Sequence, residues 1–199
     1  MNNITNITIP KDLRSGDIVV FWGGHGNIIS FLIESFTKGG PSHVAMVETV
    51  DSDGTVWITE STIESGVSGV QRRKLLYTLI GYPDNSSAAV LYLSNATRAR
   101  ADLSVITPLT NKFYGKGYNV WGLFKDAFGP TAIRELETDK KFVCSQWVAF
   151  LTDAAKITIG VNPTPESPGE ILSFIGVYSD KAVLLGKPNF KNFYLGFLQ

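Results

Sequence analysis

Short runs of β-forming residues, separated by turn signals, occupy much of the first half of the chain and constrain its fold more than any other feature. Runs short enough for single strands cover residues 18–22, 43–50, 55–61 and 88–93. An Asp-Gly turn, Asp51-Ser-Asp-Gly54, joins the second run to the third and predicts a hairpin between them. Because hairpin strands are antiparallel, we predict an antiparallel sheet.

The clearest helical pattern comes late in the chain, from residue 144 to about residue 156. Its apolar residues share one face, and they are Cys144, Trp147, Val148, Leu151, Ala154 and Ala155. Earlier patterns predict helices over residues 28–36 and from Thr97 to about Phe113, and Pro108 is expected to kink or end the second of these. Helices that accompany an antiparallel sheet are typical of the α+β class.

The sequence contains no internal repeat, low-complexity block or linker. At 199 residues the chain is long enough to bury a full core. We therefore predict a single domain over residues 1–199, in which residues 1–12 form an N-terminal arm.

Composition excludes several classes of protein. The 18 basic and 18 acidic residues cancel, and no basic cluster indicates nucleic-acid binding. One cysteine forms no intramolecular disulfide, and one cysteine with two histidines is too few for a typical zinc site. We expect no metal and no organic cofactor.

The N-terminal residues lack both a basic stretch and a continuous apolar core, so we expect no signal peptide. No run of about 18 apolar residues predicts a membrane span. A cytoplasmic protein, or one exported without an N-terminal mark, is the resulting expectation.

Cys144 is the only cysteine, and two interpretations of it compete. A free cysteine on the apolar face of a helix is usually a packing residue. However, Cys144 lies in the first turn of its helix, where free N–H groups and the helix dipole favour a thiolate. The N–H groups of Cys144 and Ser145 are also placed to stabilise an oxyanion at an attacked carbonyl.

Two histidines are candidate bases for such a thiol. His43 begins the β-rich run His-Val-Ala-Met-Val, where a strand would hold the imidazole in place. His25 lies in a glycine-rich segment, which holds an imidazole less firmly. We favour His43. The segment Gly39-Gly-Pro-Ser42 lets backbone approach a ligand closely just before it, so Ser42 is a candidate residue of the cleft.

A Cys–His pair generally needs a third group that orients the imidazole. Glu60 ends the run Val-Trp-Ile-Thr-Glu, which the Asp-Gly turn places antiparallel to the His43 strand. Glu48 has the wrong strand parity and Glu64 falls in the following loop, so both are less favoured. Asp17 is interpreted as a turn residue whose carboxylate accepts backbone N–H groups.

Several segments, in this order and spacing, resemble the permuted NlpC-type (YiiX/YebB-like) papain-fold cysteine hydrolases over roughly residues 13–174. The segments are Leu13-Arg-Ser-Gly-Asp-Ile-Val-Val-Phe21, Ser30 to Thr37, Pro41-Ser-His-Val-Ala-Met-Val47, Thr59-Glu60, Phe142-Val-Cys-Ser145 and Pro165-Glu-Ser-Pro-Gly-Glu-Ile-Leu172.

The resemblance implies a circularly permuted papain-like α+β fold, with the histidine strand first and the nucleophile helix late. It also implies that His43 is the base, Cys144 the nucleophile and Glu60 the third member. The family often has an aspartate after the tyrosine near Tyr118, where this chain has Asn119.

The combined expectation is a cysteine hydrolase that cleaves an amide bond of a peptide or cell-wall-type substrate through a thioester. Two alternatives stay open. A lipid-directed thioesterase or acyltransferase would use the same three residues on a lipid ester, and a non-catalytic module would bind peptide or glycan in the same cleft.

Overall fold

A computed structural model describes residues 7, 9–22, 41–63, 68–82, 86–117, 143–157 and 178–185 of the chain. The last of these ranges is described by its main chain alone.

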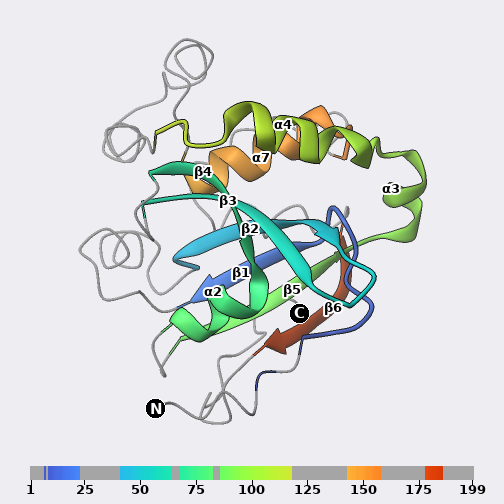
Figure 1. The fold of residues 1–199 in the computed structure, drawn as a ribbon. Coiled ribbons are helices and arrows are strands. Elements are labelled where there is room, and N and C mark those ends of the chain that lie inside the picture. The colour runs from blue at the N-terminus through green and yellow to red at the C-terminus, as the bar shows by residue number, and fades with distance from the viewer. Residues whose placement is uncertain are drawn as a thin grey trace.

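A six-stranded antiparallel sheet forms the centre of the described structure (Figure 1). The order across the sheet is β4-β3-β2-β1-β5-β6. The strands are β1 (Ile18–Trp22), β2 (His43–Val50), β3 (Val56–Thr62), β4 (Gly69–Lys74), β5 (Ser87–Leu93) and β6 (Tyr178–Leu185). An antiparallel sheet with helices is the α+β arrangement that the sequence predicts.

Four α-helices and one 3-10 turn accompany the sheet in the described ranges. They are α2 (Leu75–Gly81), α3 (Asn95–Arg100), the 3-10 turn η2 (Leu103–Val105), α4 (Ile106–Phe113) and α7 (Cys144–Ala154). None of the helices in these ranges is long and apolar enough to cross a membrane.

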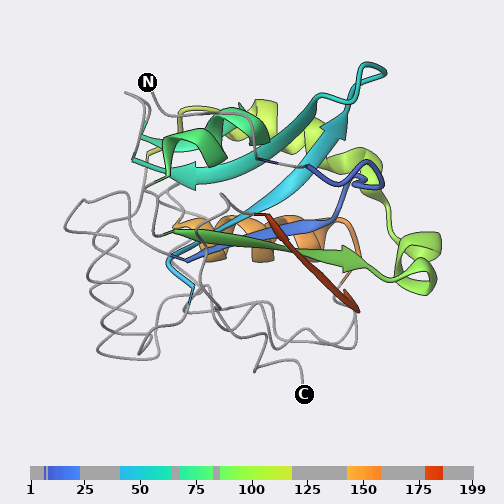
Figure 2. The same ribbon diagram turned by 90° about the horizontal axis from the view of Figure 1, so that it is seen from below.

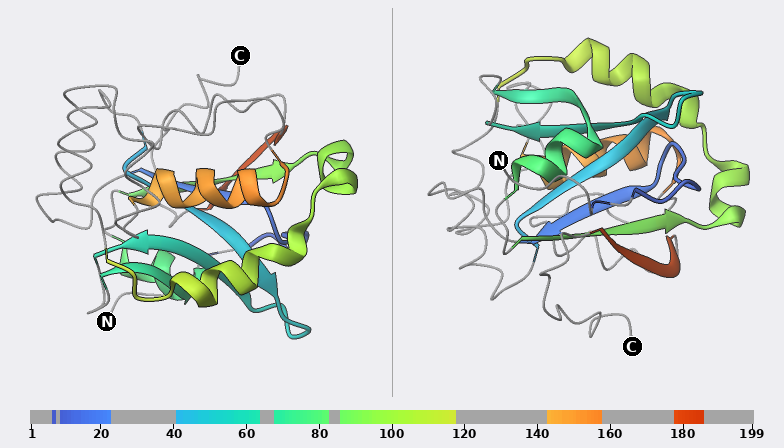
Figure 3. Two further views of the ribbon diagram at one scale, coloured as in Figure 1. Left: turned by 90° about the horizontal axis from the view of Figure 1, so that it is seen from above. Right: turned by 60° about the horizontal axis from the view of Figure 1, so that its bottom comes forward.

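Helices α2 and α7 cover opposite faces of the sheet (Figures 2 and 3). Alternation along β1 divides its side chains between two cores, because Ile18 and Val20 pack toward α7 while Val19 and Phe21 pack toward α2. Trp147 of α7 is the largest fully buried side chain of the α7 core. Strand β2 is buried on both faces and therefore forms a rigid support for its first residue, His43.

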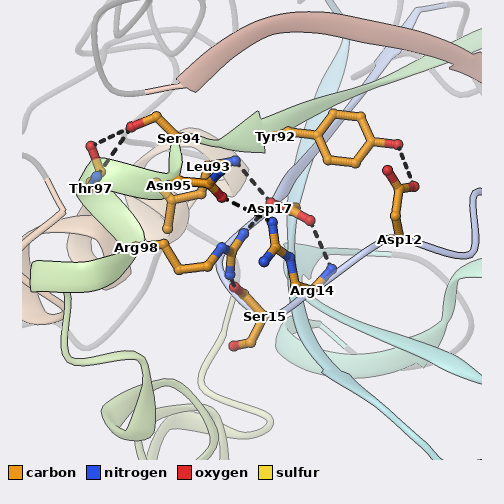
Figure 4. Close-up of polar contacts among 10 residues, drawn as sticks. All are labelled: Asp12, Arg14, Ser15, Asp17, Tyr92, Leu93, Ser94, Asn95, Thr97 and Arg98. Carbon is orange, nitrogen blue, oxygen red and sulfur yellow. Dashed lines mark hydrogen bonds and ion pairs between the residues drawn. The ribbon is translucent and has the colours of Figure 1, made fainter.

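A buried carboxylate joins the start of β1 to the end of β5. Asp17 accepts the backbone N–H of Arg14 at 2.8 Å and that of Leu93 at 2.9 Å. The Arg98 guanidinium of α3 also binds Asp17, with 2.5 Å between Nη2 and Oδ1. Figure 4 shows Asp17 at the centre of these contacts, so the prediction that its carboxylate binds backbone N–H groups is confirmed.

The predicted strands agree with the structure to within one residue. The runs at 18–22 and 43–50 coincide with β1 and β2, while those at 55–61 and 88–93 shift by one residue at one or both ends. The predicted late helix begins at Cys144 as expected and ends at Ala154, about two residues early. In the predicted N-terminal arm, Ile7 and Ile9 pack against the α2 core.

The prediction of one helix from Thr97 to Phe113, broken at Pro108, is wrong. The chain leaves the helical conformation at Ala101, and Pro108 lies inside α4. Val105 is the N-cap of α4, which makes Pro108 its third residue. The first N–H groups of a helix have no carbonyl partner within it, so proline removes no hydrogen bond there.

Strand β4, helix α2 and strand β6 were not expected from the sequence. Predictions for helices at 28–36 and 119–128, a helix at 169–174 and an edge strand in the C-terminal tail lie outside the described residues.

The outer edge of β4 pairs at its start with the segment that follows α4. Val70 N–H donates to the carbonyl of Lys116 at 3.1 Å, and Gly115 N–H donates to the carbonyl of Val70 at 2.8 Å. Gly69 has a φ of +106°, and a Cβ on it would lie 1.5 Å from the Lys116 carbonyl oxygen. Glycine is therefore required at this crossing.

Candidate active site

The β2–β3 hairpin brings His43 and Glu60 onto the same face of the sheet. Met46 pairs with Thr59 across the hairpin, and this register places Ala45 opposite Glu60. His43 has the same parity as Ala45 and is therefore the diagonal neighbour of Glu60. Nε2 of His43 lies 2.8 Å from Oε2 of Glu60.

The imidazole is held on more than one side. Phe21, opposite His43 in the β1–β2 pairing, has its ring centroid 5.6 Å from that of the imidazole. The ring of Tyr82 stacks on Phe21 with 4.9 Å between centroids. The His43 side chain is 14% exposed, so one part of it faces solvent.

Cys144 reaches His43 from the other side of the sheet. Cys144 is the first residue of α7 and belongs to the core on the α7 face. His43 is the first residue of β2, so its side chain lies at the end of the strand. Cys144, in the first turn of α7, is near it there. The Cys144 side chain lies close enough to the imidazole to raise the pKa of His43. Because Nε2 binds Glu60, Nδ1 is the nitrogen left for the thiol.

The electrostatics of this group favour a charged imidazole. Burial alone would lower the pKa of His43, but Cys144 and Glu60 outweigh burial and raise this pKa from 6.5 to about 10. Burial would raise the pKa of Glu60, but His43 and Arg73 outweigh it and hold this pKa below its usual value. The imidazole therefore lies between the Cys144 side chain and a buried carboxylate.

The second oxygen of Glu60 has partners that the sequence analysis missed. Nη1 of Arg73 lies 3.3 Å from Oε1 of Glu60, and Nε2 of Gln71 lies 3.4 Å from the same oxygen. Both residues belong to β4, where Gln71 pairs directly with Glu60. The run Gln71-Arg-Arg-Lys74 contained a signal for these contacts. Gln71 and Arg73 are two residues apart, and residues two apart on a strand share a face.

The two serines proposed for the cleft differ in their surroundings. The backbone N–H and the hydroxyl of Ser42 both donate to the carbonyl of Phe21, at 2.9 and 3.3 Å. Ser42 thereby continues the β1–β2 pairing up to His43. Ser145 is buried in the first turn of α7. Gln146, in the same turn, accepts the N–H of Val143 at 3.2 Å and fixes the start of the helix.

Glu48 lies on the opposite face from His43, as its strand parity predicts. Its Oε2 is 3.3 Å from Nε of Arg72, the neighbour of Arg73 in β4. His25, Glu64 and Asn119 lie outside the described residues.

Within the described ranges, no three His, Cys, Asp or Glu side chains are grouped as a metal site requires. No protein-family model matches the chain, and no curated protein matches it.

Proposed function

We propose that the protein is a cysteine hydrolase with a permuted papain-like fold, which cleaves an amide bond of a peptide or cell-wall-type substrate. The observation that carries the proposal is the 2.8 Å contact between His43 Nε2 and Glu60 Oε2, made by an imidazole whose pKa the Cys144 side chain helps to raise. A nucleophile, a base and a group that orients the base are the parts that thiol catalysis needs. The order of the histidine strand and the late cysteine helix supports the permuted fold.

In the first half of the proposed reaction, the Cys144 thiolate attacks the carbonyl carbon and forms a C–S bond. The imidazolium of His43 then gives its proton to the leaving nitrogen as the C–N bond breaks, which leaves a thioester on Cys144. Glu60 holds the ring so that one nitrogen faces the reacting atoms throughout.

In the second half, neutral His43 takes a proton from water as the water oxygen attacks the thioester. The C–S bond breaks, the acid leaves, and the thiolate–imidazolium pair is restored. The negative oxygen that forms in both halves is stabilised by the N–H groups of Cys144 and Ser145. These groups precede the first intrahelical bond of α7, in which Trp147 N–H donates to Val143 O at 3.0 Å.

A non-catalytic binding module is the second candidate, and the burial of the thiol favours it. Cys144 is 1% exposed, as a packing cysteine would be. The two candidates differ in what they require of the imidazole. A packing cysteine has no need of a hydrogen-bonded histidine with a carboxylate behind it, whereas a nucleophile does.

Alkylation of the thiol as a function of pH separates these candidates. A small reagent such as iodoacetamide suits a buried sulfur, and intact mass gives an unambiguous readout because the chain has one cysteine. The expected result is half-maximal reactivity well below about pH 8.5, the value for a free thiol. His43→Ala should move the midpoint upward, and the matched His25→Ala should leave it unchanged. A thiol that stays unreactive up to about pH 9 would reject the enzyme.

The substrate class is tested by trapping the acyl intermediate. Muropeptides and phospholipids are incubated separately with the protein, and Cys144→Ser serves as the blank. The amide proposal expects a mass adduct on Cys144 from muropeptides. An adduct from phospholipid alone would instead establish the lipid-directed thioesterase or acyltransferase.

A further inference from the structure

The carboxylate of Glu60 is bound from two strands, one at each oxygen. Oε2 faces His43 of β2, while Oε1 faces Arg73 and Gln71 of β4. Glu60 itself is 1% exposed. A buried carboxylate fixed at both oxygens cannot rotate away from the imidazole without breaking contacts on the far side.

Alternation along β4 gives its two arginines separate partners. Gln71 and Arg73 share the face of Glu60, whereas Arg72 lies on the other face beside Glu48. The two ion pairs are therefore independent. Among the described contacts, Arg73 brings the permanent positive charge to the Cys144–His43–Glu60 group.

We propose that Arg73 is a positioning residue of the candidate site, which acts through Glu60 and is assisted by Gln71. This inference rests on the proposed function, because it assigns a role within the same site. Arg73 holds Oε1 of Glu60 so that Oε2 stays turned toward His43, and it keeps the carboxylate charged in its buried position.

The charge of Arg73 matters most when the imidazole is neutral. With Cys144 as thiolate and His43 as imidazolium, the four groups sum to zero. Once His43 has given up its proton to the leaving group, Arg73 is the remaining cation beside the buried carboxylate among the described contacts. Without it, Glu60 would take up a proton and stop orienting the base.

Removal of this cation should raise the proton affinity of every group around it. The titratable and charged groups that face the pair are Cys144 from α7, His43 from β2, Glu60 from β3 and Arg73 from β4. Phe21 contacts both the imidazole and the ring of Tyr82, with 5.6 Å and 4.9 Å between centroids.

Two titrations of the full chain test the proposal without a known substrate. Thiolate formation is followed by its ultraviolet absorbance, with Cys144→Ser as the blank, and the imidazole of His43 is followed by NMR, with His25→Gln to assign its signal. Arg73→Gln should shift both midpoints upward by about one pH unit. Arg73→Lys restores the charge and should return both midpoints most of the way.

Lys74→Gln is the matched control, because it removes the same charge from the same strand. The Lys74 ammonium lies 5.2 Å from the Trp57 ring centroid, away from Glu60. The thiol and imidazole midpoints of Lys74→Gln should therefore equal those of the wild type. A folded Arg73→Gln with unmoved midpoints would overturn the positioning role. If Arg73→Gln does not fold, Arg73→Lys alone tests the role of the charge. A thiol or imidazole midpoint in Arg73→Lys that differs from the wild type by more than about one pH unit would show that the positive charge at this position is not sufficient. Failure of the proposed function looks different, since the wild-type thiol itself would then behave as a free one.

Discussion

Nε1 of Trp147 donates a hydrogen bond of 2.9 Å to Oγ1 of Thr59, the residue before Glu60. This contact joins the helix that carries Cys144 to the strand that carries the carboxylate. Thr110 of α4 donates to the same hydroxyl oxygen at 3.0 Å. Three elements thus meet at one buried threonine, on the face of β3 opposite to the His43 contact.

Thr59→Val should destabilise the fold by about 1–3 kcal/mol, because it leaves the buried indole N–H without its acceptor. The free energy of unfolding is measured by urea denaturation. Thr78→Val is the matched control, since the Thr78 hydroxyl donates only locally to the carbonyl of Lys74 at 3.2 Å. We expect a loss of about 0.5 kcal/mol there, and equal losses in the two variants would contradict the assigned contact.

The imidazole of His43 should titrate near pH 10 in the folded protein instead of 6.5. Glu60→Gln removes one anionic partner and should lower this pKa, as should Cys144→Ser. Because the folded value is the higher one, the charged ring adds to the free energy of unfolding below pH 6.5, and this contribution is lost as the pH rises toward 10. NMR of the ring protons gives the midpoint, and a wild-type value near 6.5 would reject the ion pair.

Asp17→Asn should cost about 3–5 kcal/mol, because it removes a buried charge and leaves Arg98 without its carboxylate. The amide also places a donor where Arg14 and Leu93 direct N–H groups. Asp12→Asn is a suitable control, since Asp12 is exposed and accepts one bond of 3.1 Å from the Tyr92 hydroxyl. Thermal unfolding should show a large loss for the first variant and a small one for the second.

Gly69→Ala and Gly54→Ala form a matched pair, since both glycines have a positive φ, of +106° and +84°. At Gly54 a Cβ would meet nothing within 4 Å, so the cost is conformational strain of about 1–2 kcal/mol. At Gly69 the added carbon collides with the Lys116 carbonyl and must displace that segment. Chemical denaturation should show a clearly larger loss at Gly69, and similar losses would contradict the close crossing.

Apolar strands could be predicted from the sequence, but the polar edge strand could not. Strands β1, β2 and β5 consist largely of apolar residues and stand out against their turns. Strand β4 reads Gly-Val-Gln-Arg-Arg-Lys, a composition typical of a solvated segment. Its strand conformation comes from pairing with β3, which is a long-range contact that no local pattern carries.

Helix boundaries were predictable where local signals exist. Helix α7 has a continuous apolar face over eleven residues, whereas α2 has only seven residues and its N-cap, Lys74, makes no side-chain cap hydrogen bond. A proline was interpreted as a helix breaker at Pro108, although its place in the first turn made it harmless. The position of a proline relative to the helix start decided its effect.

The hairpin between the His43 and Glu60 strands followed from the Asp-Gly turn, but the contact between the two side chains needed more. Next to the turn, Val50 pairs with Val56, and this register continued without interruption would place Glu60 opposite Met46, on the other face from His43. A register shift between Val47 and Thr49 places Glu60 opposite Ala45 instead, and no local pattern in the sequence shows this shift. The contact of Arg73 was missed because β4 was not predicted as a strand. Once β4 is known to be a strand, alternation assigns one arginine to each face.

The pairing at the start of β4 also bears on how this protein behaves in a concentrated solution. An unpaired strand edge is a template on which another chain can add a strand and begin to aggregate. The outward N–H and carbonyl of Val70 are already occupied by Lys116 and Gly115. The next outward positions of the strand are Arg72 and Lys74, whose charges repel a like copy. Pairing at the start of this edge and charge along the rest of it therefore both oppose intermolecular strand addition to the strand that carries Arg73.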